Sequence, residues 1–171
     1  SFPKDDICQL YVQPMMPNVD KSKSYYRITD TDALRSIFMA RDSCVGKAFS
    51  YEQNFATNRG SNDNGGLKSK IYSVGRKRTS GIYIARNAIW HLSKWYSRDL
   101  RQWIRDFGPD VLFFASGDYQ FAYDIAYRIS CDFDIPMIMY CCDDYYINRL
   151  NPHALLSRPI HSNLMRSVRK C

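Results

Sequence analysis

Two short apolar runs in the second half of the chain are each followed by polar and aromatic residues suited to binding a ligand. These residues are Ser116, Gly117, Asp118 and Tyr119 after the first run, and Asp143, Asp144, Tyr145 and Tyr146 after the second. Carboxylates and hydroxyls form hydrogen bonds with polar ligands, and tyrosine rings add flat apolar faces. Glycine has no Cβ, so a ligand can approach its backbone N–H closely.

The apolar runs themselves are predicted to be strands. Residues 111–115 and 137–141 are apolar and too short for helices, so we expect two buried strands. Between them, apolar residues recur at helical spacing from Tyr119 to Cys131. The pattern predicts a right-handed strand–helix–strand unit with parallel strands. Ligands of parallel sheets bind beyond the carboxyl ends of the strands, where both polar groups lie.

Each polar group also has a purely structural interpretation. Ser116 and Asp118 are typical N-cap residues and would then cap the helix that follows. Asp143 and Asp144 would end a strand in solvent, and only one of two adjacent side chains can face a cleft. Asp132 and Asp134 form an Asp-x-Asp motif, but it lies at the opposite ends of the strands, so we expect no metal site there.

The remaining elements follow from the same patterns. We expect a strand over 7–12, an extended piece over 25–28, a helix over about 31–40, a single long helix over about 81–107 and a basic helix over 160–170. Pro109 and Asp110 are expected to stop the long helix. With 171 residues, the chain predicts a single α/β domain with a parallel sheet flanked by helices in three layers.

A basic insertion at about 41–80 interrupts this pattern. It is rich in glycine and asparagine, and a long loop of this kind is either a solvated insertion or functional. The functional interpretation is a surface that contacts an anionic membrane or a phosphate-bearing acceptor. Its basic residues are Lys68, Lys70, Arg76, Lys77 and Arg78. The formal net charge of +7 is compatible with the same partners, whereas no nucleic-acid-binding motif accompanies it.

The cysteines and hydropathy limit the location. The six cysteines form no CxxC pair and no histidine cluster accompanies them, so no metal or other cofactor is expected. Cysteines next to apolar runs are expected to be buried in the protein core. Because no disulfide pattern is evident, we expect the protein to lie in the reducing cytoplasm. No apolar run approaches the roughly 20 residues of a membrane-spanning helix. The chain begins without methionine, and we expect it to be part of a longer protein.

Taken in order, these segments resemble the N-terminal domain of GT-B glycosyltransferases, especially the retaining type that builds bacterial cell-surface polysaccharides. The resemblance rests on a Pro109-Asp110-Val111 strand before a loop, on Ile135-Pro136 before the next strand, and on the arginine-rich helix that follows. It covers most of the chain except the insertion. Many relatives carry a histidine where Ala115-Ser116 stands here, so no catalytic residue is assigned.

The resemblance implies a function and partners. In such enzymes the N-terminal domain binds the acceptor, and the two polar groups would contact a saccharide or lipid-linked acceptor. The nucleotide-sugar donor would bind a C-terminal domain that lies beyond this chain, so we expect the fragment alone to be inactive. The parent enzyme would be a cytoplasmic, peripheral membrane transferase.

Two other functions stay open from the residues. The first is a stand-alone α/β binding or signalling module that holds a metal or phosphate at the Asp143-Asp144 strand end. Such a module would gain thermal stability from a divalent metal. The second is a basic nucleic-acid-binding protein, whose binding to any duplex would depend steeply on salt.

Overall fold

The structure of the protein is a computed structural model that describes residues 2–13, 21–40, 44–50, 80–141 and 157–171. The chain divides into two units, each built from two segments. Unit 1 comprises Ser1–Val74 and Leu92–Gly108, and unit 2 comprises Gly75–His91 and Pro109–Cys171. The expectation of a single domain remains a prediction.

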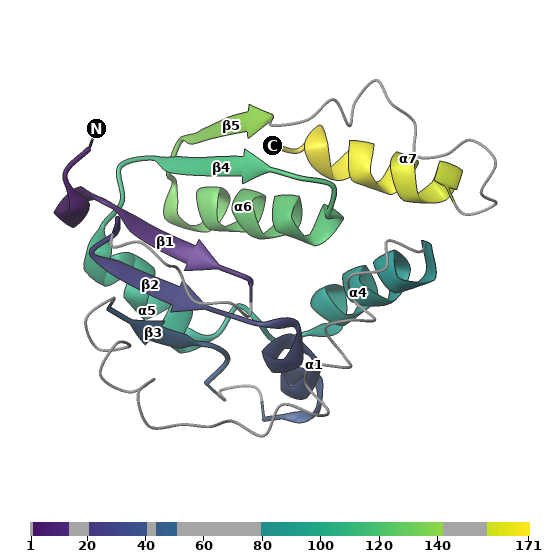
Figure 1. The fold of residues 1–171 in the computed structure, drawn as a ribbon, viewed down its shortest axis with the longest axis horizontal. Coiled ribbons are helices and arrows are strands. Elements are labelled where there is room, and N and C mark those ends of the chain that lie inside the picture. The colour runs from purple at the N-terminus through teal and green to yellow at the C-terminus, as the bar shows by residue number, and fades with distance from the viewer. Residues whose placement is uncertain (1, 14–20, 41–43, 51–79, 142–156) are drawn as a thin grey trace. The chain divides into compact units, whose positions relative to one another are not determined.

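Unit 1 contains a small mixed sheet. Its described elements are the 3-10 helix η1 (Lys4–Asp6), β1 (Cys8–Tyr11), β2 (Ser24–Arg27), α1 (Asp30–Phe38), β3 (Lys47–Phe49) and α5 (Arg98–Phe107). β1 pairs in parallel with β2, and β3 pairs antiparallel with β2 (Figure 1). The strand, the extended piece and the short helix agree with the sequence prediction. β3 was not predicted, because its three residues show no alternation and lie within the polar insertion.

Local hydrogen bonds explain where α1 begins. The backbone N–H of Asp32 donates to Thr29 Oγ1 at 3.2 Å, and the Thr29 N–H donates to Asp32 Oδ2 at 2.9 Å. This reciprocal capping box satisfies two amides that have no partner within the helix. The N-cap residues expected before this helix are therefore confirmed.

The single long helix predicted over 81–107 is wrong, because the chain forms two helices there. α4 spans Ser80–Leu92 and α5 spans Arg98–Phe107. Between them, the Lys94 N–H donates to Ser36 Oγ at 2.9 Å instead of to a helical carbonyl. The side chain of Ser97 then caps α5 by accepting from the Leu100 N–H. α5 ends at Phe107, and its C-cap Gly108 has a left-handed φ of +64° directly before the predicted stop at Pro109.

The core of unit 1 forms around two tyrosines of β2. Tyr25 and Tyr26 are both buried, and Tyr25 stacks on Phe49 of β3 with 5.4 Å between ring centroids. The buried Tyr26 hydroxyl donates to the Val45 carbonyl at 2.9 Å, so its polar atom is satisfied. Trp103 of α5 packs against the Tyr26 ring. This packing attaches α5 to the sheet.

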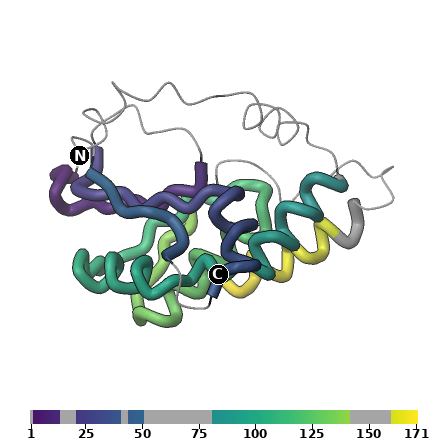
Figure 2. The backbone as a smooth tube through the Cα atoms, turned by 90° about the horizontal axis from the view of Figure 1, so that it is seen from below, coloured from purple at the N-terminus to yellow at the C-terminus, as the bar shows by residue number. Residues whose placement is uncertain are grey.

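Unit 2 is the strand–helix–strand unit that the sequence predicts. Its elements are α4, β4 (Leu112–Ser116), α6 (Gln120–Phe133), β5 (Met137–Cys141) and α7 (Ser157–Val168). β4 and β5 are parallel and in register from Leu112–Met137 to Ser116–Cys141. In the backbone view of Figure 2, this unit is coloured from teal through green to yellow. The α/β class is therefore shown, and the described strands form two small sheets.

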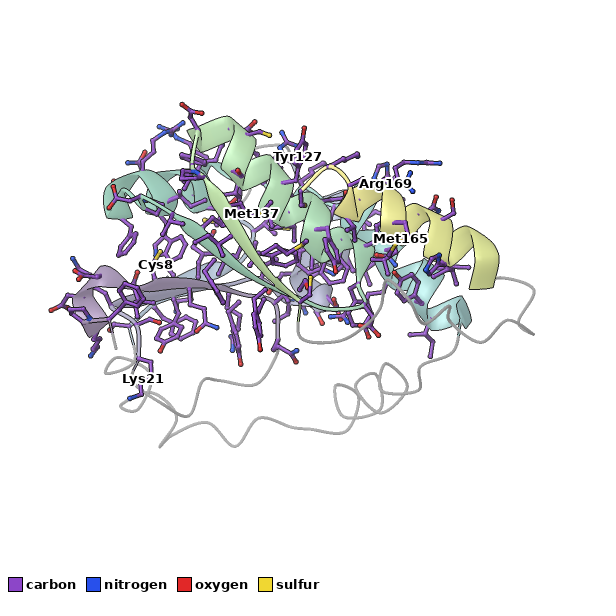
Figure 3. All side chains as sticks on the ribbon, turned by 90° about the horizontal axis from the view of Figure 1, so that it is seen from above. Cys8, Lys21, Tyr127, Met137, Met165 and Arg169 are labelled. Atoms are coloured by element: carbon purple, nitrogen blue, oxygen red, sulfur yellow. The ribbon has the colours of Figure 1, made fainter. Side chains whose placement is uncertain are left out.

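Helices cover one face of the β4–β5 sheet. Phe114 and Met139 point toward α6 and α7 and pack against a buried cluster of Tyr123, Leu164 and Val168. Figure 3 shows Met137 on β5 and Met165, which packs against the same cluster, on α7. On the opposite face, Phe113 is 65% exposed and Tyr140 is 57% exposed in the part of the chain that the structure describes. The prediction of two buried strands is therefore wrong, because alternate residues of both strands are exposed.

The described cysteines are less buried than the sequence predicts. Cys8 is half-buried on β1, whereas Cys131 and Cys141 are exposed. Burial raises the pKa of the Cys8 thiol to about 11. Within the ranges that the structure describes, no helix has both the length and the apolar character needed to cross a membrane.

Candidate functional site

The first predicted group of ligand-binding residues forms the loop between β4 and α6. Ser116 is the last residue of β4 and is only 4% exposed. Its hydroxyl donates to the Tyr140 carbonyl of β5 at 3.0 Å, so it ties the two parallel strands together. The cap of α6 is Tyr119, which makes no side-chain capping bond. The interpretation of Ser116 and Asp118 as helix caps is therefore wrong.

The backbone of this loop is held from within α6. The Gly117 carbonyl accepts a hydrogen bond of 2.9 Å from the Tyr123 hydroxyl, one turn into the helix. No described atom lies within 4 Å of the position that a Cβ would take at Gly117. The described residues therefore leave the side on which a side chain would project uncovered.

Side chains of α4 cap the start of α6. The Gln120 N–H donates to the Tyr83 hydroxyl at 3.3 Å, and the Phe121 N–H donates to Asn87 Oδ1 at 3.1 Å. The Asn87 amide nitrogen also donates to the Tyr83 carbonyl at 3.0 Å. The helix amides that most often bind anions are thus already occupied.

Rings and a guanidinium group form a continuous row beside the loop, which we call the aromatic row. The Tyr83 and Tyr119 rings stack with 5.7 Å between centroids, and those of Phe121 and Trp90 stack at 4.6 Å. The Arg86 guanidinium carbon lies 4.2 Å from the Tyr119 centroid and 5.0 Å from that of Phe121. Cation–π attraction favours this position. Arg86 therefore covers one face of the Tyr119 ring.

Burial keeps the hydroxyls at this site protonated. Burial raises the pKa of Tyr83 to about 12, and the negative charge of Asp118 adds to the shift. Burial also raises the pKa of Tyr123. Both tyrosines therefore act as neutral hydrogen-bonding groups near neutral pH.

Asp118 differs from the rest of the loop. Asp118 is half-buried, and its carboxylate makes no hydrogen bond or ion pair with any residue that the structure describes. By contrast, the Ser116 hydroxyl, the Gly117 carbonyl and the backbone N–H groups of Gln120 and Phe121 form hydrogen bonds within the fold. Within the described residues, the carboxylate of Asp118 is therefore available to a ligand.

Sequence reasoning did not find the part that α4 plays. Tyr83, Arg86 and Asn87 are spaced three and four residues apart, so one face of a helix carries all three. That spacing could have indicated a functional helix face. The presence of Asn87 inside a predicted helix was a second signal, because asparagine has a low helix propensity. Nothing in the spacing indicates that this face meets the start of α6.

The second predicted group and the basic insertion lie outside the described residues. β5 ends at Cys141, opposite Ser116, and the structure does not describe Asp143, Asp144, Tyr145 or Tyr146. The same holds for Lys68, Lys70, Arg76, Lys77 and Arg78. Their predicted roles stay predictions.

The Asp-x-Asp motif has a structural explanation. Asp132 pairs with Arg128 one turn earlier in α6, with 3.5 Å between the charged atoms. Asp134 ends α6 in the left-handed conformation, with φ of 53°, which aspartate tolerates better than most residues. In the described part of the chain, no group of three or more histidine, cysteine or acidic residues is placed to hold a metal ion.

Comparisons of the chain with protein-family models, with curated proteins and with solved structures find no match.

Proposed function

We propose that this chain is the acceptor-binding half of a GT-B glycosyltransferase, with a parallel Rossmann-like organisation. The full enzyme would move a sugar from a nucleotide-sugar donor to a polysaccharide or lipid-linked acceptor. A C-terminal donor-binding domain of the same protein would complete it. The proposal combines the family resemblance of the sequence with the parallel β4–α6–β5 unit and its polar loop.

The observation that carries the proposal is the carboxylate of Asp118. It follows the carboxyl end of a parallel strand, next to a Ser116 hydroxyl and a Gly117 carbonyl that form hydrogen bonds within the fold. Carboxylates accept hydrogen bonds from sugar hydroxyls, and such charge-assisted bonds are stronger than neutral ones. Among the described residues other than its two chain neighbours, none would contact a Cβ at Gly117. In this proposal Asp118 orients an acceptor hydroxyl, and the catalytic groups come from elsewhere in the enzyme.

A glycan array probed with the 171-residue chain tests this function. We expect binding to a limited set of saccharides, and loss of most of that binding in Asp118→Ala. Asp110→Ala is a matched control, because it removes an exposed carboxylate at the opposite end of β4. If the folded chain binds no saccharide, or if both variants bind like the parent, the proposed function is wrong.

The stand-alone module with a phosphate site receives no support from the described part of the loop. The first amides of α6 are bound to Tyr83 and Asn87, and a carboxylate lies beside them. Its proposed strand end at Asp143-Asp144 lies outside the described residues. A rise in melting temperature on adding a divalent metal would favour that module over the transferase.

The proposal includes a peripheral position at an anionic membrane on the cytoplasmic side. Supporting it, Arg166, Arg169 and Lys170 are exposed at the end of α7, whose sequence contains no acidic residue. Figure 3 shows Arg169 at this end of the helix. Each basic residue near an anionic surface contributes about 1 kcal/mol to binding. Cosedimentation with anionic but not with neutral vesicles, weakened by salt, is the expected result, and equal binding to both would contradict it.

A further inference from the structure

We propose that the end of α1 inserts into the surface of an anionic lipid bilayer, and that Phe38 is the side chain that enters the lipid. The inference rests on the peripheral membrane position in the proposed function, and it names the part of unit 1 that makes the contact. The apolar residues concerned are Leu34, Phe38 and Met39, which we call the α1 patch. The basic end of α7, by contrast, belongs to unit 2.

The α1 patch exposes apolar side chains at the end of a helix. Phe38 is 86% exposed, and Leu34 and Met39 are 44% and 42% exposed, in the part of the chain that the structure describes. Leu34 and Phe38 lie one turn apart on the same face of α1. The other face holds the helix in unit 1, because Ala33 and Ser36 are buried there. A phenyl ring this exposed to water gains free energy when it enters an apolar medium.

Two basic side chains lie beside the α1 patch. Arg35 is exposed in the last turn of α1. The Lys94 ammonium donates to the Met39 carbonyl, and the Lys94 backbone N–H donates to Ser36 Oγ at 2.9 Å, so this lysine is held against the end of the helix. An ammonium group has three donors, so Lys94 can donate to a lipid phosphate while it keeps the bond to the carbonyl.

The distribution of charge along α1 favours an anionic surface at this end. The acidic residues Asp30 and Asp32 lie in the first turn of the helix, whereas the α1 patch and Arg35 lie at the other end. Basic residues are attracted to an anionic bilayer, and apolar side chains beside them enter the boundary between headgroups and acyl chains. The formal net charge of +7 acts in the same direction.

The size of the α1 patch favours lipid over a protein partner. A stable protein–protein interface draws on roughly 20–30 residues from each side. The α1 patch offers a few apolar side chains at one helix end, and a bilayer accepts such a group without matching its shape. An aromatic ring with two cations beside it therefore fits the headgroup region of an anionic bilayer.

Cosedimentation of the 171-residue chain with lipid vesicles tests the inference. The vesicles contain either phosphatidylcholine alone or an equimolar mixture of phosphatidylcholine and phosphatidylglycerol. We expect binding to the mixed vesicles, and Phe38→Ser should weaken it about tenfold, because the ring no longer leaves water. Phe2→Ser is the matched control, since Phe2 of the same unit is 83% exposed but lies outside the α1 patch. This control should change binding by less than about twofold.

Two further variants test the ring and the charge separately. Phe38→Trp keeps an aromatic side chain and should bind the mixed vesicles as tightly as the parent chain. Arg35→Gln should weaken binding about fivefold at low salt, and this loss should shrink as salt screens the charge. If the parent chain binds both kinds of vesicle equally, the contact is not with anionic lipid and the inference is wrong.

The outcomes separate this inference from the function on which it rests. If the chain binds mixed vesicles but Phe38→Ser weakens that binding no more than Phe2→Ser, the inference is wrong and the peripheral membrane position stands. If Phe38→Ser instead unfolds the chain in circular dichroism, or abolishes self-association in sedimentation, the ring is covered by this chain or by a second copy, and the inference is wrong. If the folded chain binds no vesicle, the membrane position falls as well, while saccharide binding on the glycan array is unaffected.

Discussion

Replacing Gly46 with alanine is predicted to destabilise unit 1 strongly. Gly46 has φ of +85° and lies between the buried Val45 and β3. A Cβ at this position would lie 2.5 Å from the Arg27 carbonyl oxygen and 2.7 Å from Ile28 Cγ1. Neither atom can move easily, because one belongs to the paired strand β2 and the other to a buried side chain.

The size of the effect follows from two separate costs. Holding an alanine in a left-handed conformation costs about 1–2 kcal/mol. Forcing an extra carbon into a packed site costs a further 1–3 kcal/mol, roughly. We therefore expect Gly46→Ala to lower the free energy of unfolding by about 2–5 kcal/mol. Gly108→Ala is the matched control, because Gly108 also has positive φ but its Cβ would meet nothing closer than 3.9 Å.

Urea unfolding followed by tryptophan fluorescence measures both variants, since Trp103 packs against Tyr26 in the same unit. Gly108→Ala should cost only about 1–2 kcal/mol, which is the conformational cost without the clash. The reasoning would be refuted if Gly46→Ala cost no more than Gly108→Ala. The steric contacts with β2 would then contribute nothing.

Three further predictions concern single groups. Asn87→Ala should destabilise the chain by about 1–3 kcal/mol in urea unfolding, because the Phe121 N–H loses its acceptor, while Asn87→Asp, which keeps an oxygen there, should cost less. The folded-state pKa of Tyr83 is above its usual value of 10, so the stability that this tyrosine contributes below pH 10 should be lost as pH rises toward 12. Tyr83→Phe should flatten that part of the curve of unfolding free energy against pH. At pH 8, iodoacetamide should modify Cys8 roughly 100-fold more slowly in the folded chain than in urea, because the raised pKa lowers the thiolate fraction. Mass spectrometry measures both rates, and equal rates would contradict the raised pKa of Cys8.

The strand–helix–strand unit was predictable because its signals are local. The apolar runs over 111–115 and 137–141 and the helical spacing between them each lie within a short window. The start of α1 was predictable for the same reason, since Thr29 and Asp32 cap each other within one turn.

The features that sequence reasoning missed depend on contacts between distant segments. The break before α5 involves a hydrogen bond from Lys94 to Ser36, 58 residues earlier in the chain. Asn87 caps a helix that begins more than thirty residues later, and spacing along one helix cannot indicate that partner. Apolar composition predicts that Phe113 and Tyr140 lie in strands, but it does not tell which face of a sheet is covered.

The order of the segments along the chain has a consequence for synthesis. The chain passes from one unit to the other after Val74, after His91 and after Gly108. A ribosome therefore releases α4 before the start of α6, whose amides Tyr83 and Asn87 cap, has been made. Unit 2 cannot complete its fold before unit 1 has been fully translated, and no single cut through the chain leaves both units whole. Truncation at one point should therefore yield at least one incomplete, aggregation-prone piece.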